Sequence, residues 1–109
     1  MNIIAKGTID YYVNRYPKAK TALLTWHKEF SKKNFKNFNE LKETYGNASI
    51  VGNSRVVFNI KANDYRLIVK VHFVKQAAYV IWFGPHADYN LVDVATIAFD
   101  TKILDFKNK

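Results

Sequence analysis

The sequence predicts an α+β domain in which N-terminal helices pack on one face of an antiparallel β-meander sheet. Three observations predict it. Apolar residues recur at helical spacing before Gly46, strand-like runs follow Gly46, and short polar turns separate those runs. Helices that precede strands in this way favour a layered α+β arrangement. At 109 residues the chain has the length of one domain. We therefore expect a single domain over 1–109, with a loose tail over 98–109.

The first part of the chain predicts a short strand and two helices. Residues 2–5 are apolar enough for a first strand. Apolar side chains at helical spacing follow until Pro17, which ends that helix. A second helix begins near Lys18, with lysines on its outer face. Its apolar face consists of Ala19, Ala22, Leu23, Trp26 and Phe30.

A third helix and the strands come next. The third helix is short, with Asn37 or Asn39 as its N-cap and Gly46 as its stop. Beyond it, runs rich in β-branched and aromatic residues alternate with turn signals, and two tight hairpins in succession make a meander. The expected strands are 49–51, 55–60, 65–74 and 77–83, with turns at 52–53, 61–64 and 75–76 and a short helix within 87–97.

The charge of the chain favours a polyanionic partner. Its formal net charge is +8, from 17 Lys and Arg residues against 9 Asp and Glu residues. Beyond Lys75 the acidic residues outnumber the basic ones, so the positive excess belongs to residues 6–75. Nucleic acid, or a very acidic protein, is the natural partner of such a surface. A basic domain without a nucleic-acid partner stays an alternative.

Composition excludes several classes of protein. With 49% hydrophobic residues the chain can bury a core, which excludes general disorder. The absence of cysteine excludes a disulfide framework and a thiol nucleophile, and fits a cytoplasmic protein. The apolar runs are strand-length and no signal peptide is recognisable, so we expect no membrane association. The three histidines lack metal-ligand spacing, so we expect neither a metal site nor a cofactor.

Three residues near the last two strands suggest chemistry on a phosphate. Arg66 opens one strand, and His86 and Tyr89 follow the end of the next. Neighbouring strands lie about 5 Å apart, so a hairpin can bring the three side chains together. If the segment after His86 turns helically, His86 and Tyr89 share one face. A guanidinium matches phosphate oxygens, and an imidazole titrates near neutrality.

These residue types suffice for metal-free cleavage of RNA. The 2′-hydroxyl must lose a proton, the phosphate gathers negative charge, and the leaving 5′-oxygen must gain a proton. His86 can serve as acid or base, Arg66 as the cation, and Tyr89 can orient the hydroxyl, stack on a base or donate a proton. The structural alternatives are a solvated arginine, a loop histidine and a packing tyrosine.

Further RNA contacts are expected around the first hairpin. Arg55 and Lys61 can contact phosphates, and Asn59 and Asn63 lie at the same end of the sheet. Asn63 can instead supply a left-handed turn conformation. Exposed aromatic residues such as Tyr65 and Trp82 can stack on bases, although sheet packing is the simpler interpretation of both.

At these same residues the sequence resembles the HigB toxin family of bacterial type II toxin–antitoxin systems, within the wider RelE-like superfamily. The likeness covers about residues 1–97, in order and with matching gaps. The segments that carry it are Arg55–Val71, Tyr79–Asn90 and Asp93–Ile97, together with Tyr16–Phe30 and Phe38–Asn53 in the helical half.

The resemblance implies a RelE-like microbial RNase fold and an mRNA interferase, that is, an endoribonuclease that cuts translated mRNA in the ribosomal A site. It also implies inhibition by a HigA-like helix-turn-helix antitoxin, with operator DNA bound only by the toxin–antitoxin complex. By resemblance, Arg66 stabilises the transition state, and His86 and Tyr89 act as acid/base and substrate-positioning residues. Asn59 and Lys61 match as lesser RNA contacts, as does Asn63.

Two positions depart from the family pattern. Pro85 stands where the family usually has Thr before the histidine, and Asn90 where it usually has Asp after the tyrosine. They motivate an alternative function, a non-catalytic RNA- or ribosome-binding module on the same scaffold. A DNA-binding regulator is a third hypothesis, although the sequence shows no convincing recognition helix.

Overall fold

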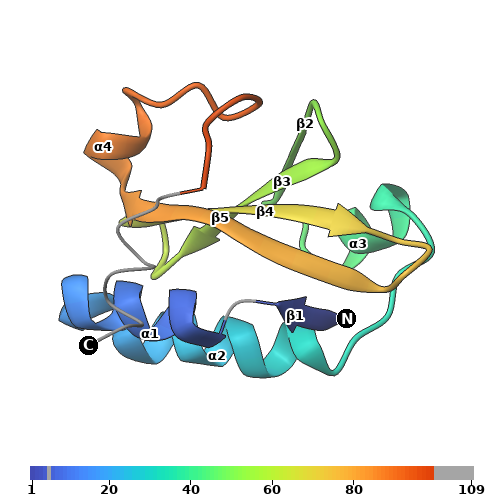
Figure 1. The fold of residues 1–109 in the computed structure, drawn as a ribbon, viewed down its shortest axis with the longest axis horizontal. Helices are drawn as coiled ribbons and strands as arrows, with labels where there is room; N and C mark the ends of the chain where they lie inside the picture. Colours follow the sequence, from blue (N-terminus) through green and yellow to red (C-terminus); the bar gives the residue numbers. More distant parts are fainter. Residues whose placement is uncertain (5, 100–109) are drawn as a thin grey trace.

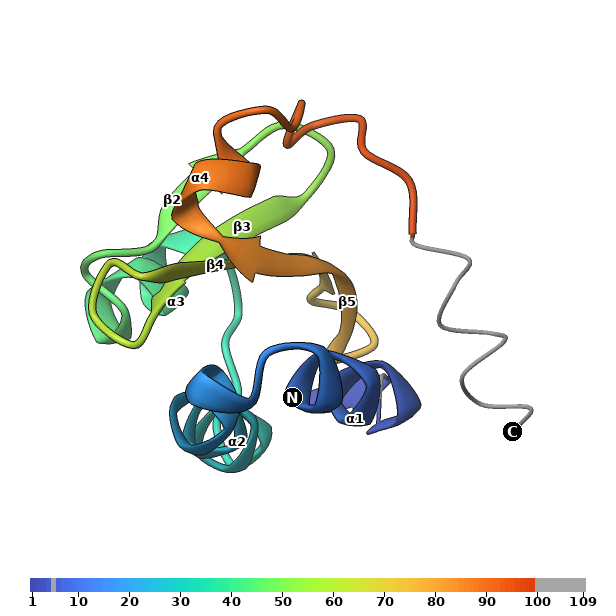
Figure 2. The ribbon, with the colours of Figure 1, turned by 90° about the vertical axis from the view of Figure 1, so that its left-hand side faces the viewer.

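The computed structural model describes residues 1–4 and 6–99. Two helices, α1 (Lys6–Arg15) and α2 (Lys20–Ser31), lie beneath one face of a five-stranded sheet. The short helix α4 (His86–Tyr89) lies over the opposite face (Figure 1, Figure 2). The strands are β1 (Asn2–Ile4), β2 (Ser49–Val51), β3 (Arg55–Ile60), β4 (Tyr65–His72) and β5 (Ala77–Pro85).

The sheet has the order β1-β5-β4-β3-β2. Strands β2 to β5 form the antiparallel meander that the sequence predicts. Strand β1 adds to the outer edge of β5 in parallel, so the sheet is mixed. The predicted fold class, α+β with helices packed on a meander, is therefore confirmed, and the parallel edge strand is an addition to it.

The main core lies between the lower face of the sheet and the helices. Residues 23, 26 and 30 of α2 are buried, which confirms the predicted apolar face, while Ala22 is half-buried. The indole of Trp26 stacks on Phe30 at 5.0 Å between ring centroids and lies 5.3 Å from Phe58 of β3. Burial of such large side chains contributes about 1.5–3 kcal/mol each.

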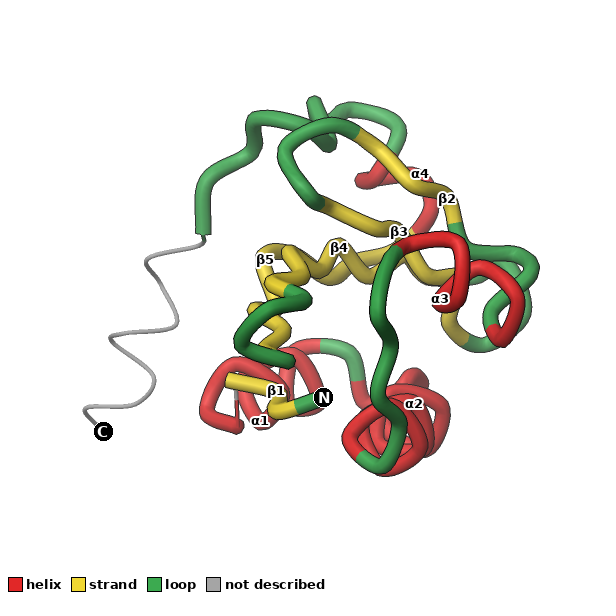
Figure 3. The backbone as a smooth tube through the Cα atoms, turned by 90° about the vertical axis from the view of Figure 1, so that its right-hand side faces the viewer, coloured by secondary structure: helices red, strands yellow, loops and turns green. Residues whose placement is uncertain are grey.

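The helix boundaries follow from local chemistry. A 3₁₀ turn, η1 (Pro17–Ala19), precedes α2, because proline fits the start of a helix but not its interior. The third helix, α3 (Phe38–Thr44), is capped by Asn37, whose side-chain oxygen accepts a hydrogen bond from Glu40 N at 3.0 Å. Asn37 is therefore the correct one of the two predicted caps. Figure 3 shows the segment that connects α2 to α3, in which the backbone of Phe35 exchanges hydrogen bonds with the side chain of Gln76 in the β4–β5 turn.

The turn between β3 and β4 spans 61–64, as the sequence predicts. Lys61 and Ala62 have φ values of 54° and 56°, whereas Asn63 does not have a positive φ. The alternative interpretation of Asn63, a left-handed turn residue, is therefore excluded. The register pairs Ile60 with Tyr65, and this pairing places the bend at 61 and 62. The tendency of asparagine to adopt the left-handed conformation does not decide the position.

The ends of the last two strands differ from the prediction. Strand β4 stops at His72, and β5 continues through Gly84 to Pro85. Strand β1 pairs only as far as Tyr79, so among the described residues the rest of β5 has a single neighbour, and such an edge tolerates proline. The short helix expected within 87–97 occupies only 86–89. Most of the tail predicted over 98–109 lies outside the described residues.

No helix in the described part of the chain is long and apolar enough to cross a bilayer.

Candidate functional site

Arg66 lies on the face of the sheet that α1 and α2 leave uncovered. It pairs with Asn59 on β3 and with Gly84 on β5. Neighbouring side chains of a strand point to opposite faces, and the next residue, Leu67, is fully buried in the core above the helices. The sheet therefore places Arg66 and Asn59 side by side on the upper face.

The Arg66 guanidinium is held by the hairpin turn. Its Nη1 donates hydrogen bonds to the carbonyl oxygens of Asn63 at 2.9 Å and Tyr65 at 3.3 Å. Its Cζ lies 5.7 Å from the centroid of the Tyr89 ring, a cation–π distance. The other guanidinium donors bond to no described residue. They can therefore bind an anion without breaking a contact of the fold.

His86 and Tyr89 are brought to Arg66 by α4. The backbone N of His86 donates to Asp64 O at 2.9 Å, which ties the start of α4 to the β3–β4 turn. The rings of His86 and Tyr89, at the two ends of this single turn, lie 6.5 Å apart and nearly perpendicular. Tyr89 thus contacts both Arg66 and His86. The structure gathers all three side chains that the sequence singled out.

A groove of about 510 Å³ opens beside His86. Lys61 and Asn63 line it from the β3–β4 turn, and Lys18 lines it from η1. Both lysines are exposed, so the groove can bind two anionic groups close to the imidazole. The sequence analysis missed Lys18, which carries no local signal beyond its charge and is brought to the groove only by the tertiary packing of the helices.

Arg55 is placed differently from the other predicted RNA contacts. Its Nη1 donates to Val94 O at 2.9 Å and to Ile97 O at 2.7 Å. Its Nε is buried and bonds to no described residue. Arg55 therefore fastens the segment after α4 onto β3, and only its remaining donors are available for a phosphate.

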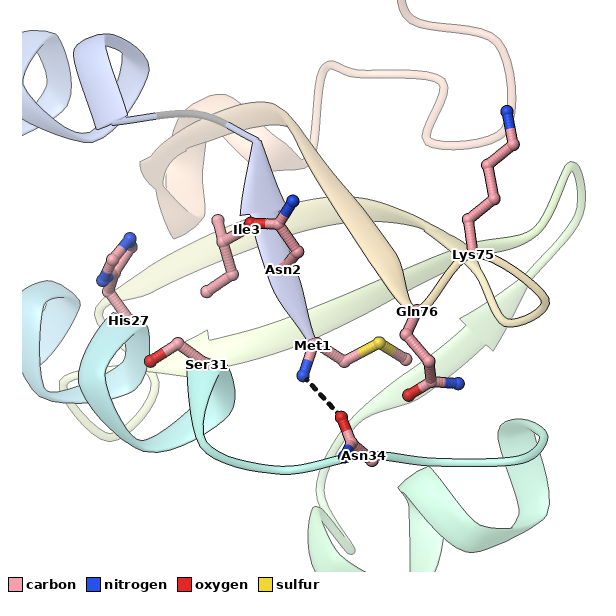
Figure 4. A pocket seen from close by; sticks show the side chains of 8 residues that line it. All are labelled: Met1, Asn2, Ile3, His27, Ser31, Asn34, Lys75 and Gln76. Atoms are coloured by element: carbon pink, nitrogen blue, oxygen red, sulfur yellow. Dashed lines mark hydrogen bonds between the residues drawn. The ribbon is translucent and has the colours of Figure 1, made fainter.

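A second hollow lies at the opposite edge of the sheet and contains none of the predicted site residues. It measures about 530 Å³ and is lined by residues of β1, α2 and the β4–β5 turn (Figure 4). The amino group of Met1 donates to Asn34 Oδ1 there, at 3.1 Å, and also contacts Lys33 O. Burial lowers the pKa of this amino group. Within residues 1–4 and 6–99, no three His, Asp or Glu side chains gather closely enough to hold a metal ion.

Comparison with known proteins identifies the family. No curated protein sequence matches the chain significantly. A family model does match, over residues 19–92, which is more than half of the 109 residues and includes every predicted site residue. That model describes the RelE-like toxic component of a toxin–antitoxin system. The chain, with Arg66, Tyr89 and His86 gathered on the open face of its sheet, belongs to the HigB toxin family.

Proposed function

We propose that this protein is a ribosome-dependent, metal-independent endoribonuclease that cleaves mRNA during translation. One observation carries the proposal: the ring of Tyr89 contacts both the guanidinium of Arg66 and the imidazole of His86. A cation, an acid/base group and a positioning group thus surround one small volume. Family membership adds that the protein is the toxin of a toxin–antitoxin system.

In the proposed reaction the RNA supplies its own nucleophile. The 2′-hydroxyl loses its proton and attacks the adjacent phosphorus, and the 5′-oxygen leaves with a proton, giving a 2′,3′-cyclic phosphate and a 5′-hydroxyl. Arg66 stabilises the charge that gathers on the phosphate oxygens. His86 transfers a proton to or from the reacting oxygens. Tyr89 positions the ribose for in-line attack.

The groove beside His86 accounts for binding of the RNA backbone. Lys18 and Lys61 can each neutralise a phosphate next to the scissile one, and Asn63 can donate to a phosphate or a ribose hydroxyl. Because each neutralised phosphate releases counterions, binding should weaken steeply as salt is raised. The net charge of +8 adds long-range attraction to ribosomal and messenger RNA.

The family implies an antitoxin partner, and we propose a HigA-like helix-turn-helix protein in this role. In this proposal the antitoxin supplies the DNA recognition, so operator DNA is bound by the complex and not by the toxin alone. The observation that checks it is whether an adjacent reading frame encodes a small helix-turn-helix protein that suppresses the toxicity.

A non-catalytic RNA- or ribosome-binding module is the second candidate function. It is favoured by the surroundings of His86. Asn90, at the position of the family's usual acid, is exposed, and its side chain bonds to no described residue. Its backbone N instead caps α4 by donating to His86 O at 3.1 Å. No carboxylate at position 90 therefore orients the imidazole.

Mapping of mRNA 5′ ends after brief induction separates the two functions. The nuclease predicts translation arrest together with new 5′ ends inside translated codons, and neither effect in an Arg66→Ala strain. Arrest without new ends would establish the binding module instead. If neither effect occurred at a verified protein level, both proposals would fail, and operator binding by the isolated chain would become the hypothesis to test.

A further inference from the structure

The indole of Trp82 occupies space that a side chain at position 84 would need. A Cβ built on Gly84 would lie 2.8 Å from both Cη2 and Cζ2 of Trp82, which is closer than real Cβ atoms approach other atoms. Gly84 itself pairs with Arg66. The missing side chain of Gly84 therefore lets the flat indole lie against the backbone of β5 next to the cation.

Trp82 continues the group formed by Arg66 and Tyr89. Its ring centroid lies 6.3 Å from that of Tyr89, with the planes tilted by 44°. The Tyr89 ring in turn lies 5.7 Å from Arg66 Cζ. Two aromatic rings and a guanidinium thus adjoin one another on the upper face of the sheet, and none of the three is fully exposed or fully buried.

We propose that Trp82 and Tyr89 form a stacking surface for an unpaired RNA base whose neighbouring phosphate is bound by Arg66. The proposal rests on the proposed RNA-directed function and adds a binding subsite to it. The three residues that form it are here termed the stacking site: Arg66, Trp82 and Tyr89.

The chemistry of the stacking site fits a nucleobase attached to a phosphate. An aromatic face binds the π-face of any base, whereas a guanidinium next to it binds the phosphate that every nucleotide carries. This combination is typical of single-stranded nucleic-acid binding without strong sequence preference. A duplex cannot use it, because its bases are already stacked, so the site should select unpaired RNA.

Trp82 also has a packing role that a test must separate from stacking. It pairs with Ile68, which is fully buried although it lies outside the core between sheet and helices. Leucine at position 82 can keep Ile68 covered but offers no ring to a base. A Trp82→Leu variant therefore removes base stacking while Ile68 stays buried. A Trp82→Phe variant keeps an aromatic ring and should retain part of the stacking.

The intrinsic fluorescence of the chain provides the test. The sequence contains two tryptophans, and Trp26 is buried in the core with an indole N–H that bonds to no described residue, so Trp26→Phe leaves no orphaned partner. In that background Trp82 is the sole reporter. The titrant is a single-stranded 2′-O-methyl oligonucleotide, which lacks the nucleophilic hydroxyl and is not cleaved. An abasic 2′-O-methyl oligomer of equal length is the matched control.

Stacking predicts that the base-containing oligomer quenches Trp82, while the abasic oligomer at equal occupancy does not. Trp82→Leu should weaken binding between about 5-fold and about 150-fold, the range for loss of one stacked base. Binding without quenching, no binding at low salt, or unchanged affinity of Trp82→Leu would each overturn the stacking site. If Trp26→Phe does not fold, the difference in emission between the wild type and Trp82→Phe gives the same answer.

This test and the test of the nuclease fail independently. Quenching with no new mRNA 5′ ends would leave the stacking site standing and remove the nuclease. New 5′ ends with no quenching would support the nuclease and overturn the stacking site.

Discussion

Arg66 of β4 stands directly opposite Gly84 of β5, so the cation has a residue without a side chain as its cross-strand neighbour. The space over Gly84 is filled by Trp82, two residues earlier on the same strand. The free donors of Arg66 remain accessible while the turn carbonyls hold Nη1. The pairing therefore combines a fixed cation with an open approach for an anion.

Replacing Arg66 should abolish toxicity while the domain stays folded. A transition-state cation contributes about 3–4 kcal/mol of barrier reduction, so Arg66→Ala should slow mRNA cleavage by at least about 100-fold. The lost hydrogen bonds to the turn should cost about 1 kcal/mol of stability. Growth after induction measures the loss of toxicity, and denaturant unfolding measures the loss of stability.

Lys70→Ala, which removes an exposed cation from the same strand, is the matched control and should remain toxic. Full toxicity of Arg66→Ala would disprove the role of Arg66.

Replacing Gly84 should destabilise the fold through Trp82. The new Cβ of Gly84→Ala overlaps the indole, and overpacking of this kind costs about 1–3 kcal/mol of unfolding free energy. Gly46→Ala is the control, since a Cβ there meets no atom within 4 Å, and it should be neutral or slightly stabilising. In a Trp82→Leu background the cost of Gly84→Ala should fall. An equal cost in both backgrounds, measured by urea unfolding, would show that the indole is not the cause.

Removing the Arg55 side chain should release the segment after α4. Arg55→Ala loses the hydrogen bonds to Val94 O and Ile97 O, at a cost of about 1–3 kcal/mol. The amide of Ile97, which donates to Asp93 O, should then exchange faster by hydrogen–deuterium exchange, while amides of β4 remain protected.

The Arg55→Ala variant also tests the predicted RNA contact of Arg55. A loss of RNA affinity well beyond the loss of stability would assign Arg55 to binding, and unchanged affinity would restrict it to the structural role.

Tyr45 should make the fold sensitive to alkaline pH. Burial of its hydroxyl, and secondarily the charge of Glu29, raise its pKa above the ordinary value near 10. A raised pKa in the folded state means that the unfolded chain ionises first. Stability is therefore complete below about pH 10 and falls as the pH rises through the folded pKa.

Tyr45→Phe is the variant that isolates this effect. The hydroxyl of Tyr45 is buried and bonds to no described residue, so its removal should cost little near neutral pH. Between about pH 8 and pH 11 the urea midpoint of the wild type should fall more than that of Tyr45→Phe. Parallel curves for the two proteins would show that Tyr45 does not titrate as described.

Local pattern predicted the meander well, and tertiary packing explains the features that it missed. Strand 55–60 matches its prediction, because β-branched and aromatic residues between turn signals leave little ambiguity. The parallel pairing of β1 was not predicted, because it joins Asn2 to Ala77 and nothing near either residue specifies the other. The left-handed residues are Lys61 and Ala62 and not Asn63, which the sequence offered as an alternative, because register rather than asparagine propensity decides where the hairpin bends.

The candidate site was predictable to a similar degree. Hairpin geometry brings Arg66, His86 and Tyr89 together, and the sequence contains both the hairpin and the residue types. Lys18 was not predictable, because η1 reaches the groove only through the packing of helices on the sheet. The anchoring role of Arg55 was not predictable either, since its partners are backbone carbonyls about 40 positions away, which no side-chain motif reveals.

The pairing of β1 with β5 has a consequence for biosynthesis. A protein is made from its N-terminus, and domains generally fold as units once their parts are available. Residues 2–4 cannot find their partners until 77–79 have left the exit tunnel, and α4 follows later still. A nascent chain therefore holds its helices without an assembled site. Arg66, His86 and Tyr89 therefore cannot come together before Tyr89 itself has left the exit tunnel.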